Sequence, residues 1–299
     1  MLEIIQVSFD GLLIGSSYSL LALGFSLVFG VLRRINLAYG STLLIGGATA
    51  TWITTHFQSS YFWIFPIMIL VSCAANVYVE KLCFNPHKGQ QGVVVSMVAS
   101  FAIWMQLDEI SSHLLPFRTH AFPELPVSNI QLDSFFVRGD QLIQFVVAII
   151  SMAILFFIVY RTKFGIILRA VANNPETART MGVNVSTVNL FTFALSGVFG
   201  GIAAFMILSS ESQITPLFGF WCTIKGLVAM MIGGVGSLIG AVLGGLFLGV
   251  LEAHLTTQFG VVYRDIGTFA ILLVILVLRP GGLIGTAVFR DDKGVNERI

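Results

Sequence analysis

Ionisable side chains that could bind a solute or transfer a proton are rare in the apolar runs of this chain. Lys225 lies well inside one run, whereas Asp10, Asp108, Glu109 and Glu252 lie within about two helical turns of a predicted helix end. Charged groups near the end of a membrane helix are solvated at the interface, which accounts for these carboxylates without a functional role. A cation deep in an apolar segment faces protein or water. Lys225 is therefore the ionisable candidate for a solute pathway.

Polar residues at a Gly-rich break in the apolar runs supply the other candidates for such a pathway. Asn36, Tyr39, Ser41 and Thr42 all stand in this break. Irregular backbone at membrane depth is tolerated only where it faces protein or a water-filled cavity. We therefore expect these residues to line a translocation pathway together with Lys225.

The sequence carries no signature of a nucleotide-binding or hydrolytic centre. It has no GxxxxGK[ST] loop for phosphates and no GxSxG, HExxH or CxxC motif. No two histidines stand four apart on a predicted helix, as a zinc site would require. Cys73, Cys83 and Cys222 are too widely spaced for a disulfide framework or a metal site. We predict no catalytic residue, no metal and no cofactor bound by this chain, which disfavours a membrane-embedded enzyme.

The connection that follows Tyr160 encodes a short capped helix. Asn174 precedes Pro175 and Glu176, the order of an N-cap, a proline at the first helical position and an acidic first turn. Gly182 stands where a left-handed residue ends a helix. Basic residues flank this helix: Arg161, Lys163, Arg169 and Arg179. The pattern fits either a solvated loop helix or a surface that a partner protein grips.

The composition predicts the kind of elements that position these residues. The chain has 299 residues, of which 56% are hydrophobic and 10% are charged, whereas a soluble domain carries roughly 25% charged residues. Such a chain cannot solvate its surface in water, so we predict an integral membrane protein. The formal net charge of +1 leaves no basic face for nucleic acid.

Nine apolar segments approach the length of about 20 residues that a membrane-spanning helix needs. The predicted fold is therefore all-α: a single polytopic bundle of transmembrane helices over residues 1–299. The second, seventh and eighth segments are short or rich in Gly and Thr, which is compatible with broken or re-entrant helices. The segments are Val7–Val31, Asn36–Thr55, Tyr61–Val79, Gly92–Leu114, Gln141–Tyr160, Leu190–Ser209, Leu217–Gly233, Gly236–His254 and Val262–Leu278.

Lysine and arginine gather in alternate connections, and basic connections stay in the cytoplasm. This rule places the N-terminus outside and the C-terminus in the cytoplasm, together with the connection 161–189 and the tail 280–299. The number of crossings must then be odd, either nine or seven with two re-entrant hairpins. The other basic positions that this rule places in the cytoplasm are Arg33, Arg34, Lys81, Lys88, Arg279, Arg290, Lys293 and Arg298. In the connection 116–140, by contrast, Glu124, Asp133 and Asp140 balance Arg118 and Arg138.

Small residues four positions apart predict close contacts between helices, because in lipid the helices associate by van der Waals packing. We expect such contacts at Gly11 and Gly15 in the first segment, and at Gly240, Gly244, Gly245 and Gly249 in the eighth.

Several runs resemble one family of membrane proteins. Glu176-x-Ala178-x3-Gly182, preceded by Arg169-Ala-Val-Ala-Asn173, resembles the EAA coupling loop of ABC importer permeases in the branched-chain amino acid branch. Further runs follow the order of that family across most of the chain, and the ordered set is more specific than any single run. They are Gly15-Ser-Ser-Tyr18-Ser-Leu-Leu-Ala-Leu-Gly24, Phe29-Gly30-Val, Ile35-Asn36-x-Ala38-x-Gly40, Glu80-Lys81, Asn85-Pro86, Gly219-Phe220, Lys225-Gly226, Gly233-Gly234-Val-Gly236-Ser237 and Gly240-Ala241-x-Leu-Gly244-Gly245-x-x-x-Gly249.

The resemblance implies a permease subunit of an ATP-driven importer in a bacterial inner membrane. Its partners would be a second, homologous permease, two cytoplasmic ATPase subunits that bind ATP and Mg²⁺, and an extracytoplasmic solute-binding protein. The residues implied to couple to the ATPases are Arg169, Asn174, Pro175, Glu176, Ala178 and Gly182.

The resemblance leaves the solute open between branched-chain or other neutral amino acids and urea or short amides. The family commonly has the run Asn-Phe-Ala-His-Gly-Glu where this chain has Asn36-Leu-Ala38-Tyr39-Gly40-Ser41. A self-contained secondary transporter or channel is disfavoured, because it would couple through intramembrane acids that the middles of these segments lack.

Overall fold

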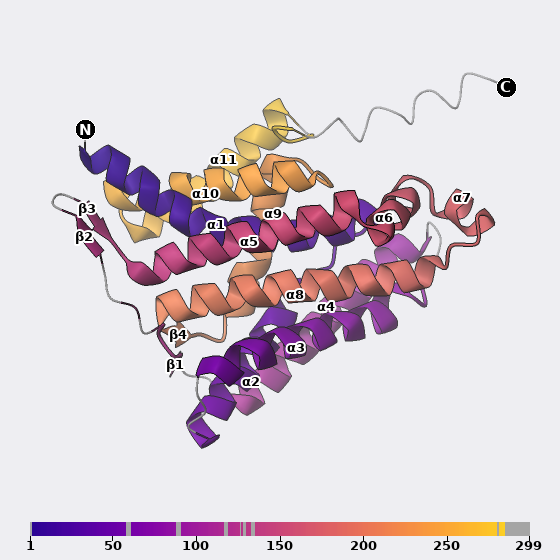
Figure 1. Cartoon of the computed structure of the whole chain (residues 1–299), viewed down its shortest axis with the longest axis horizontal. Coiled ribbons are helices and arrows are strands. Elements are labelled where there is room, and N and C mark those ends of the chain that lie inside the picture. The colour runs from indigo at the N-terminus through magenta and orange to yellow at the C-terminus, as the bar shows by residue number, and fades with distance from the viewer. Residues whose placement is uncertain are drawn as a thin grey trace.

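The computed structural model describes residues 2–57, 61–87, 91–116, 119–125, 127, 130–132, 135–279 and 281–284. These residues form a bundle of helices with short strands at one end (Figure 1). The helices are α1 (Leu2–Leu32), α2 (Tyr39–Phe57), α3 (Tyr61–Val79), the π-helical turn η1 (Glu80–Phe84), α4 (Gln91–Leu114), α5 (Gly139–Arg161), α6 (Lys163–Asn173), α7 (Pro175–Thr180), α8 (Val185–Glu211), α9 (Phe218–Gly233), α10 (Leu238–Phe259) and α11 (Val261–Leu278).

Each apolar segment identified in the sequence coincides with a helix of the structure. Six of the described helices, namely α1, α3 with η1, α4, α5, α8 and α10, are long and apolar enough to cross a membrane. The suggestion that the eighth segment is broken is wrong, because α10 runs without interruption from Leu238 to Phe259. The seventh segment is short, as expected, since α9 has 16 residues. A total of nine crossings stays a prediction.

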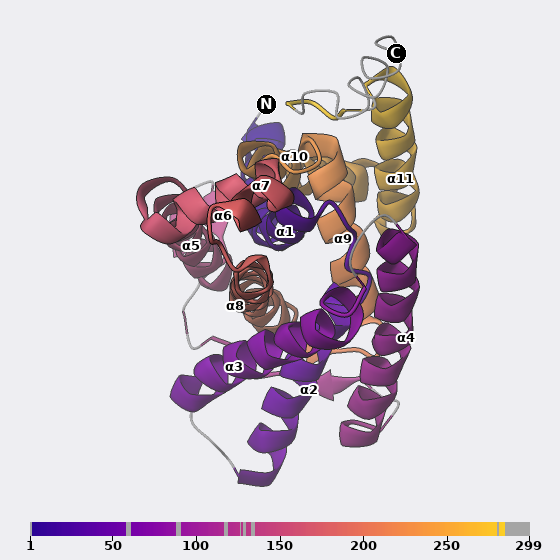
Figure 2. The same cartoon turned by 90° about the vertical axis from the view of Figure 1, so that its right-hand side faces the viewer.

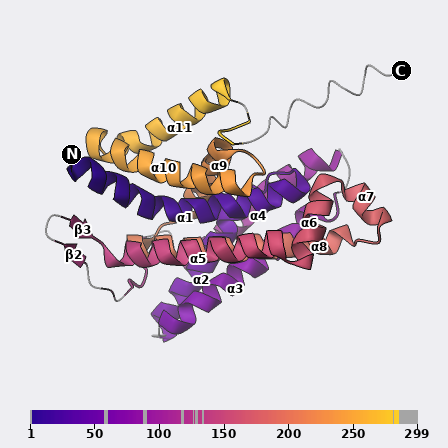
Figure 3. The same ribbon diagram turned by 45° about the horizontal axis from the view of Figure 1, so that its top comes forward.

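Different elements lie at the two ends of the bundle. Figure 1 and Figure 3 show α6 and α7 at one end, and the N-terminus with β2 and β3 at the other. At the α7 end, the Arg34 guanidinium donates to the carbonyl of His87. Ser186 Oγ donates to Asn85 Oδ1 at 2.8 Å. The basic connections after α1 and η1 therefore meet the start of α8 beside α7, while Lys88 and most of the tail fall outside the described residues.

Helix α1 lies at the centre of the bundle, surrounded by α5, α8, α9 and α10 (Figure 2). Its middle section is buried all round, as at Leu20, Leu21 and Leu23, which explains why this helix is apolar on every face. Glycines let α10 approach it closely: a Cβ built on Gly249 would lie 2.3 Å from Cα of Gly15.

The other predicted packing glycines lie on the same two helices. Gly11 faces the α10 backbone at Val250, and Gly245 faces Ser19 of α1. Gly240 and Gly244 face the opposite neighbour, α9, where both meet Gly233. Helix α10 thus uses one pair of glycines against α1 and another pair against α9.

Two small antiparallel sheets are the part of the fold that the sequence analysis did not predict. Strand β1 (His120–Ala121) pairs with β4 (Gln213–Ile214), and β2 (Ile130–Leu132) pairs with β3 (Phe135–Val137). The first sheet ties the connection after α4 to the link between α8 and α9. The strands have two or three residues each, too few for an alternating pattern to be visible in the sequence.

Candidate functional site

Helices α6 and α7 form a projecting segment at one end of the bundle, and local capping shapes it. Thr162 Oγ1 caps α6 by accepting a hydrogen bond from the Gly165 amide at 3.1 Å. Asn174 Oδ1 caps α7 by accepting from the amides of Glu176 and Thr177 at 3.0 and 3.1 Å. The N-cap and the proline at the first turn of α7 are those that the sequence predicts.

The C-terminal end of α7 is a complete Schellman motif. Gly182 has φ +83°, and its amide donates to the Arg179 carbonyl at 3.0 Å. The next amide, that of Val183, donates to the Ala178 carbonyl at 3.1 Å. This pairing satisfies carbonyls that would otherwise be left free at the helix end, and it requires a left-handed residue at the glycine.

One residue fastens α7 to the bundle, and the rest of the helix faces outward. Ala178 is 2% exposed and packs in a cluster with Val31 of α1, Leu168 and Val171 of α6, and Val185 and Val188 of α8. Glu176 and Arg179 are exposed, and Met181 is 76% exposed. Arg169 lies over the ring of Tyr160, with 5.3 Å between the guanidinium carbon and the ring centroid. The segment therefore presents a rigid, charged and partly apolar surface.

Asn36 and Thr42, two of the predicted pathway residues, belong to one buried polar network. Asn36 lies in the non-helical stretch between α1 and α2 rather than inside a helix. Its Nδ2 is 3.5 Å from Asn76 Oδ1, and Asn76 Nδ2 donates to Thr42 Oγ1 at 2.6 Å. All three side chains are at most 1% exposed, so their mutual hydrogen bonds offset the cost of burial.

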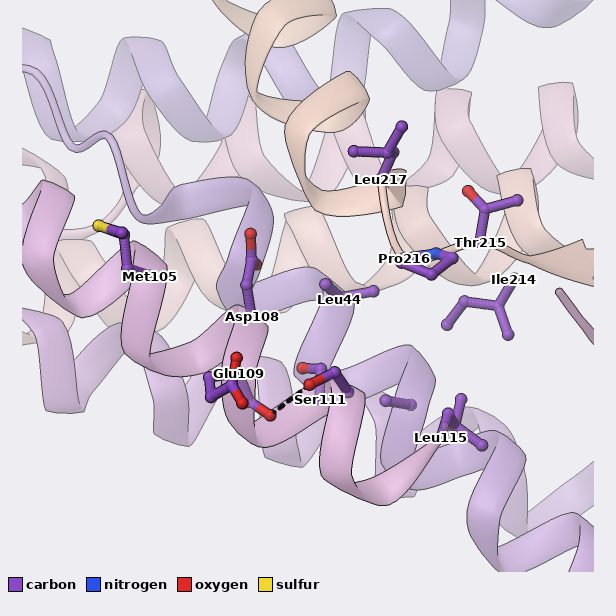
Figure 4. Close-up of a pocket in the computed structure, with 12 residues that line it drawn as sticks. Leu44, Met105, Asp108, Glu109, Ser111, Leu115, Ile214, Thr215, Pro216 and Leu217 are labelled. Carbon is purple, nitrogen blue, oxygen red and sulfur yellow. Dashed lines mark hydrogen bonds between the residues drawn. The ribbon is translucent and has the colours of Figure 1, made fainter. Parts of the chain in front are cut away.

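Ser41 connects the same region to helix α4 and to a pocket. Ser41 Oγ donates to Asp108 Oδ1 at 2.6 Å, and Trp104 Nε1 donates to Asp108 Oδ2 at 2.7 Å. Asp108 lines a cavity of about 340 Å³ between α2, α4 and the link that leads into α9. Figure 4 shows this cavity, with Leu44, Pro216 and Leu217 labelled around it. Two hydrogen bonds, rather than interfacial water alone, therefore hold the Asp108 carboxylate.

Tyr39 is packed into the core of the bundle. It is 1% exposed, and its hydroxyl donates to the Ser196 carbonyl at 3.3 Å. A Cβ added to Gly24 or to Gly200 would lie 1.9 or 2.3 Å from the Tyr39 hydroxyl. These two glycines make room for the ring, whose role is to join α1, α2 and α8.

Lys225 is buried in an ion pair that the sequence analysis missed. Its Nζ lies 2.6 Å from both carboxylate oxygens of Glu252, and the Tyr18 hydroxyl donates to Glu252 Oε2 at 2.9 Å. Glu252 is 4% exposed, so the expectation that this carboxylate is solvated at an interface is wrong. The reason is that Glu252, although only about two turns from the end of α10 at Phe259, faces α9 and α1, where Lys225 and Tyr18 bind its carboxylate.

The predicted pathway residues fall on opposite sides of α9. Thr223 Oγ1 accepts a hydrogen bond from the Gly40 amide at 3.0 Å, so this face of α9 meets α2. Lys225, two positions later, faces α1 and α10. Residues two apart on a helix point in nearly opposite directions. The structure therefore separates Lys225 from Asn36, Tyr39, Ser41 and Thr42, and a transport role for either group stays a prediction.

Comparison with known proteins agrees with this architecture. Residues 7–278 match the family described as "Branched-chain amino acid transport system / permease component". The high-affinity branched-chain amino acid transport system permease protein BraD of Pseudomonas aeruginosa is 30% identical over 295 residues, which cover 94% of this chain and 95% of BraD. LivH of Escherichia coli, with the same description, is 26% identical over 297 residues, covering 95% of this chain and 96% of LivH. A probable branched-chain amino acid transport permease protein LivH of Methanocaldococcus jannaschii is 29% identical over 281 residues, covering 89% of this chain and 88% of the relative.

These observations define the class of the protein. Its long apolar helices make it a multi-pass membrane protein. The match spans nearly the whole bundle, from α1 to the end of α11. The chain belongs to the permease family of branched-chain amino acid transport systems, whose curated members named above are transport subunits.

Proposed function

We propose that this chain is one permease subunit of an ATP-driven importer for branched-chain or other neutral amino acids. The descriptions of its relatives support this solute class. Residues 1–299 would act as one membrane domain in a bacterial inner membrane, with the N-terminus outside and the C-terminus in the cytoplasm. A homologous second permease and an extracytoplasmic solute-binding protein would complete the external side, and two ATPase subunits would supply ATP and Mg²⁺.

The observation that carries this proposal is the exposed, doubly capped helix α7. A six-residue helix is far too short to be stable alone, yet caps at both ends and the buried Ala178 fix it in one conformation. Glu176, Arg179 and Met181 then point away from the bundle. Such a preordered surface binds a partner at a low cost in conformational entropy. In our account that partner is an ATPase subunit.

The packing of α7 provides a route by which a movement of the ATPases would reach the bundle. The cluster around Ala178 includes Val31 near the end of α1 and Val185 at the start of α8. Helix α1 lies at the centre of the bundle, and α8 packs against it (Figure 2). Closure of the ATPases would displace α7 and, through this cluster, shift α1 and α8 between outward-open and inward-open states. Each state must make different contacts with its partners, because a ligand shifts an equilibrium only through differential affinity.

The direct test is uptake of radiolabelled solutes by cells that lack this gene and carry it back on a plasmid. We expect the restored gene to rescue uptake of labelled leucine or another neutral amino acid. Rescue of labelled urea or a short amide, with leucine uptake unchanged, would keep the permease and reassign its solute. No rescue of any of these solutes by a chain that reaches the membrane would refute the proposal.

A further inference from the structure

Two adjoining cavities lie at the end of the bundle opposite α7. The larger, of about 630 Å³, is bounded by α1, α5, α8, α10 and α11. The smaller, of about 220 Å³, lies beside α9 and reaches Lys225. Tyr18, Ile207, Glu211 and Arg264 line both cavities, so these four residues mark the place where the cavities meet.

Charges of both signs line these cavities in equal number. The cationic side chains are Arg138, Lys225 and Arg264, and the carboxylates are Asp10, Glu211 and Glu252. Such a lining favours a ligand that itself carries one charge of each sign, because an ion of a single sign leaves the opposite set of protein charges uncompensated.

Lys225, Glu252 and Arg138 of this set already have partners within the protein. Lys225 and Glu252 form the pair described above, and Tyr18 bonds both of them. Arg138 is likewise paired with Asp140, at 2.8 Å. These groups line the cavities with their charges already compensated.

Besides these paired groups the set contains Arg264, Glu211 and Asp10, and of the three Arg264 and Glu211 line both cavities, whereas Asp10 lines the larger one alone. Arg264 Nε is buried and makes no hydrogen bond within the described chain, although it lies 3.5 Å from Asp265 Oδ1 and 4.0 Å from Glu252 Oε2. The Glu211 carboxylate, at the end of α8, is exposed and forms no hydrogen bond or ion pair with the described residues. One cation and one carboxylate with spare capacity therefore face the same space.

We infer that this space, enclosed by Tyr18, Ile207, Glu211 and Arg264, binds the zwitterion of an α-amino acid with an apolar side chain. The α-carboxylate lies against the Arg264 guanidinium, and the α-ammonium lies against the Glu211 carboxylate. The side chain lies against the partly buried Ile14 and Ile207, which also line the larger cavity. This inference rests on the proposed import of amino acids, and it places a binding site within one permease subunit.

Equilibrium binding to the purified full-length chain in lipid nanodiscs tests the inference with three labelled probes. Leucine carries both charges, leucinamide carries only the ammonium, and 4-methylpentanoate carries only the carboxylate. A hydrogen-bonded ion contact typically changes affinity by about tenfold or more. We expect leucine to bind at least about tenfold more tightly than either analogue.

Two substitutions should each abolish the preference for leucine over one of the two analogues. Arg264→Gln should weaken leucine binding about tenfold or more and leave leucinamide binding unchanged or stronger. Glu211→Gln should weaken leucine binding to a similar extent and spare 4-methylpentanoate. Glu109→Gln and Lys81→Gln remove exposed charges that line neither cavity and should leave all three affinities unchanged. Thermal unfolding of each variant identifies any that fails to fold.

The possible results test the proposed binding site separately from the proposed import of amino acids. Leucine binding that both cavity substitutions leave at the wild-type value, in folded protein, would overturn the site. Equal loss of all three probes in both variants would also overturn it, because charge recognition predicts opposite selectivities. Cells carrying the wild-type chain report on amino-acid import separately, so leucine uptake by the wild type together with normal uptake by both variants would refute the site alone.

Discussion

Replacement of Gly182 by valine isolates the part played by the backbone at the end of α7. The glycine has φ +83°, and a Cβ placed on it would meet no atom within 4 Å. The added side chain therefore has room, and the whole cost comes from the left-handed conformation. For a residue with a Cβ this costs roughly 1–2 kcal/mol, and a β-branched residue is a genuine outlier there.

A valine that leaves the left-handed region gives up both bonds of the Schellman motif. These are the bonds from Gly182 to Arg179 and from Val183 to Ala178, worth about 0.5–1.5 kcal/mol each. By either route the free energy that favours the docked form of α7 falls by about 1–3 kcal/mol. This lowers the ratio of docked to undocked α7 by about 5- to 150-fold. The substitution lies outside the bundle core, so the chain should still reach the membrane.

The assay is co-purification of the ATPase subunits with the tagged permease, together with amino-acid uptake. We expect Gly182→Val to reduce both strongly and Gly182→Ala to reduce both partly. Gly182→Asn is the matched control, because asparagine tolerates the left-handed region, and it should retain both. If valine and asparagine behave alike, the backbone conformation at this position is not what holds the coupling surface.

Three further predictions concern the bundle. Lys225→Met should lower the free energy of unfolding by about 3–5 kcal/mol, because it leaves the buried Glu252 carboxylate unpaired. Combining Lys225→Met with Glu252→Leu should recover most of this lost stability in a thermal melt. Equal stability of the single and double variants would contradict the ion pair. Gly249→Val should prevent folding, since its Cβ would lie 2.3 Å from the α1 backbone. Gly30→Ala is the control and should express normally, because the nearest atom to its Cβ would be 3.6 Å away. A well-folded Gly249→Val would refute the close α1–α10 contact. A reporter fused after Ile299 should read cytoplasmic and one inserted in the connection 116–140 should read external, and cytoplasmic readings from both would rule out the proposed orientation.

The features that the sequence predicts best are those decided by neighbouring residues. Asn174, Pro175 and Gly182 determine the start and the end of α7 by local backbone geometry. Apolar runs predict helices for a similar reason, since a membrane segment must satisfy its own backbone hydrogen bonds. This is why each predicted segment coincides with a helix.

The features that the sequence could not supply depend on which helix faces meet. Glu252 stands 27 residues after Lys225 along the chain, and only the packing of α9 against α1 and α10 brings the two side chains together. The run Thr-Thr-Gln-Phe after Leu255 extends the helix from its predicted end at His254 to Phe259, but it does not indicate which neighbouring helix Glu252 faces. The separation of Ser41 from Lys225 by α9 has no local signal, because it depends on the rotation of α9 about its own axis.

The central claim is that this chain carries an amino acid only when ATPase subunits act on α7. Its most direct test is uptake of labelled leucine into proteoliposomes that contain the assembled complex and its solute-binding protein, with ATP supplied on the ATPase side. The account predicts uptake with ATP, none with a non-hydrolysable ATP analogue, and none with ATP when the permease carries Gly182→Val. Uptake driven by an ion gradient or membrane potential without ATP would contradict it and would indicate a self-contained transporter.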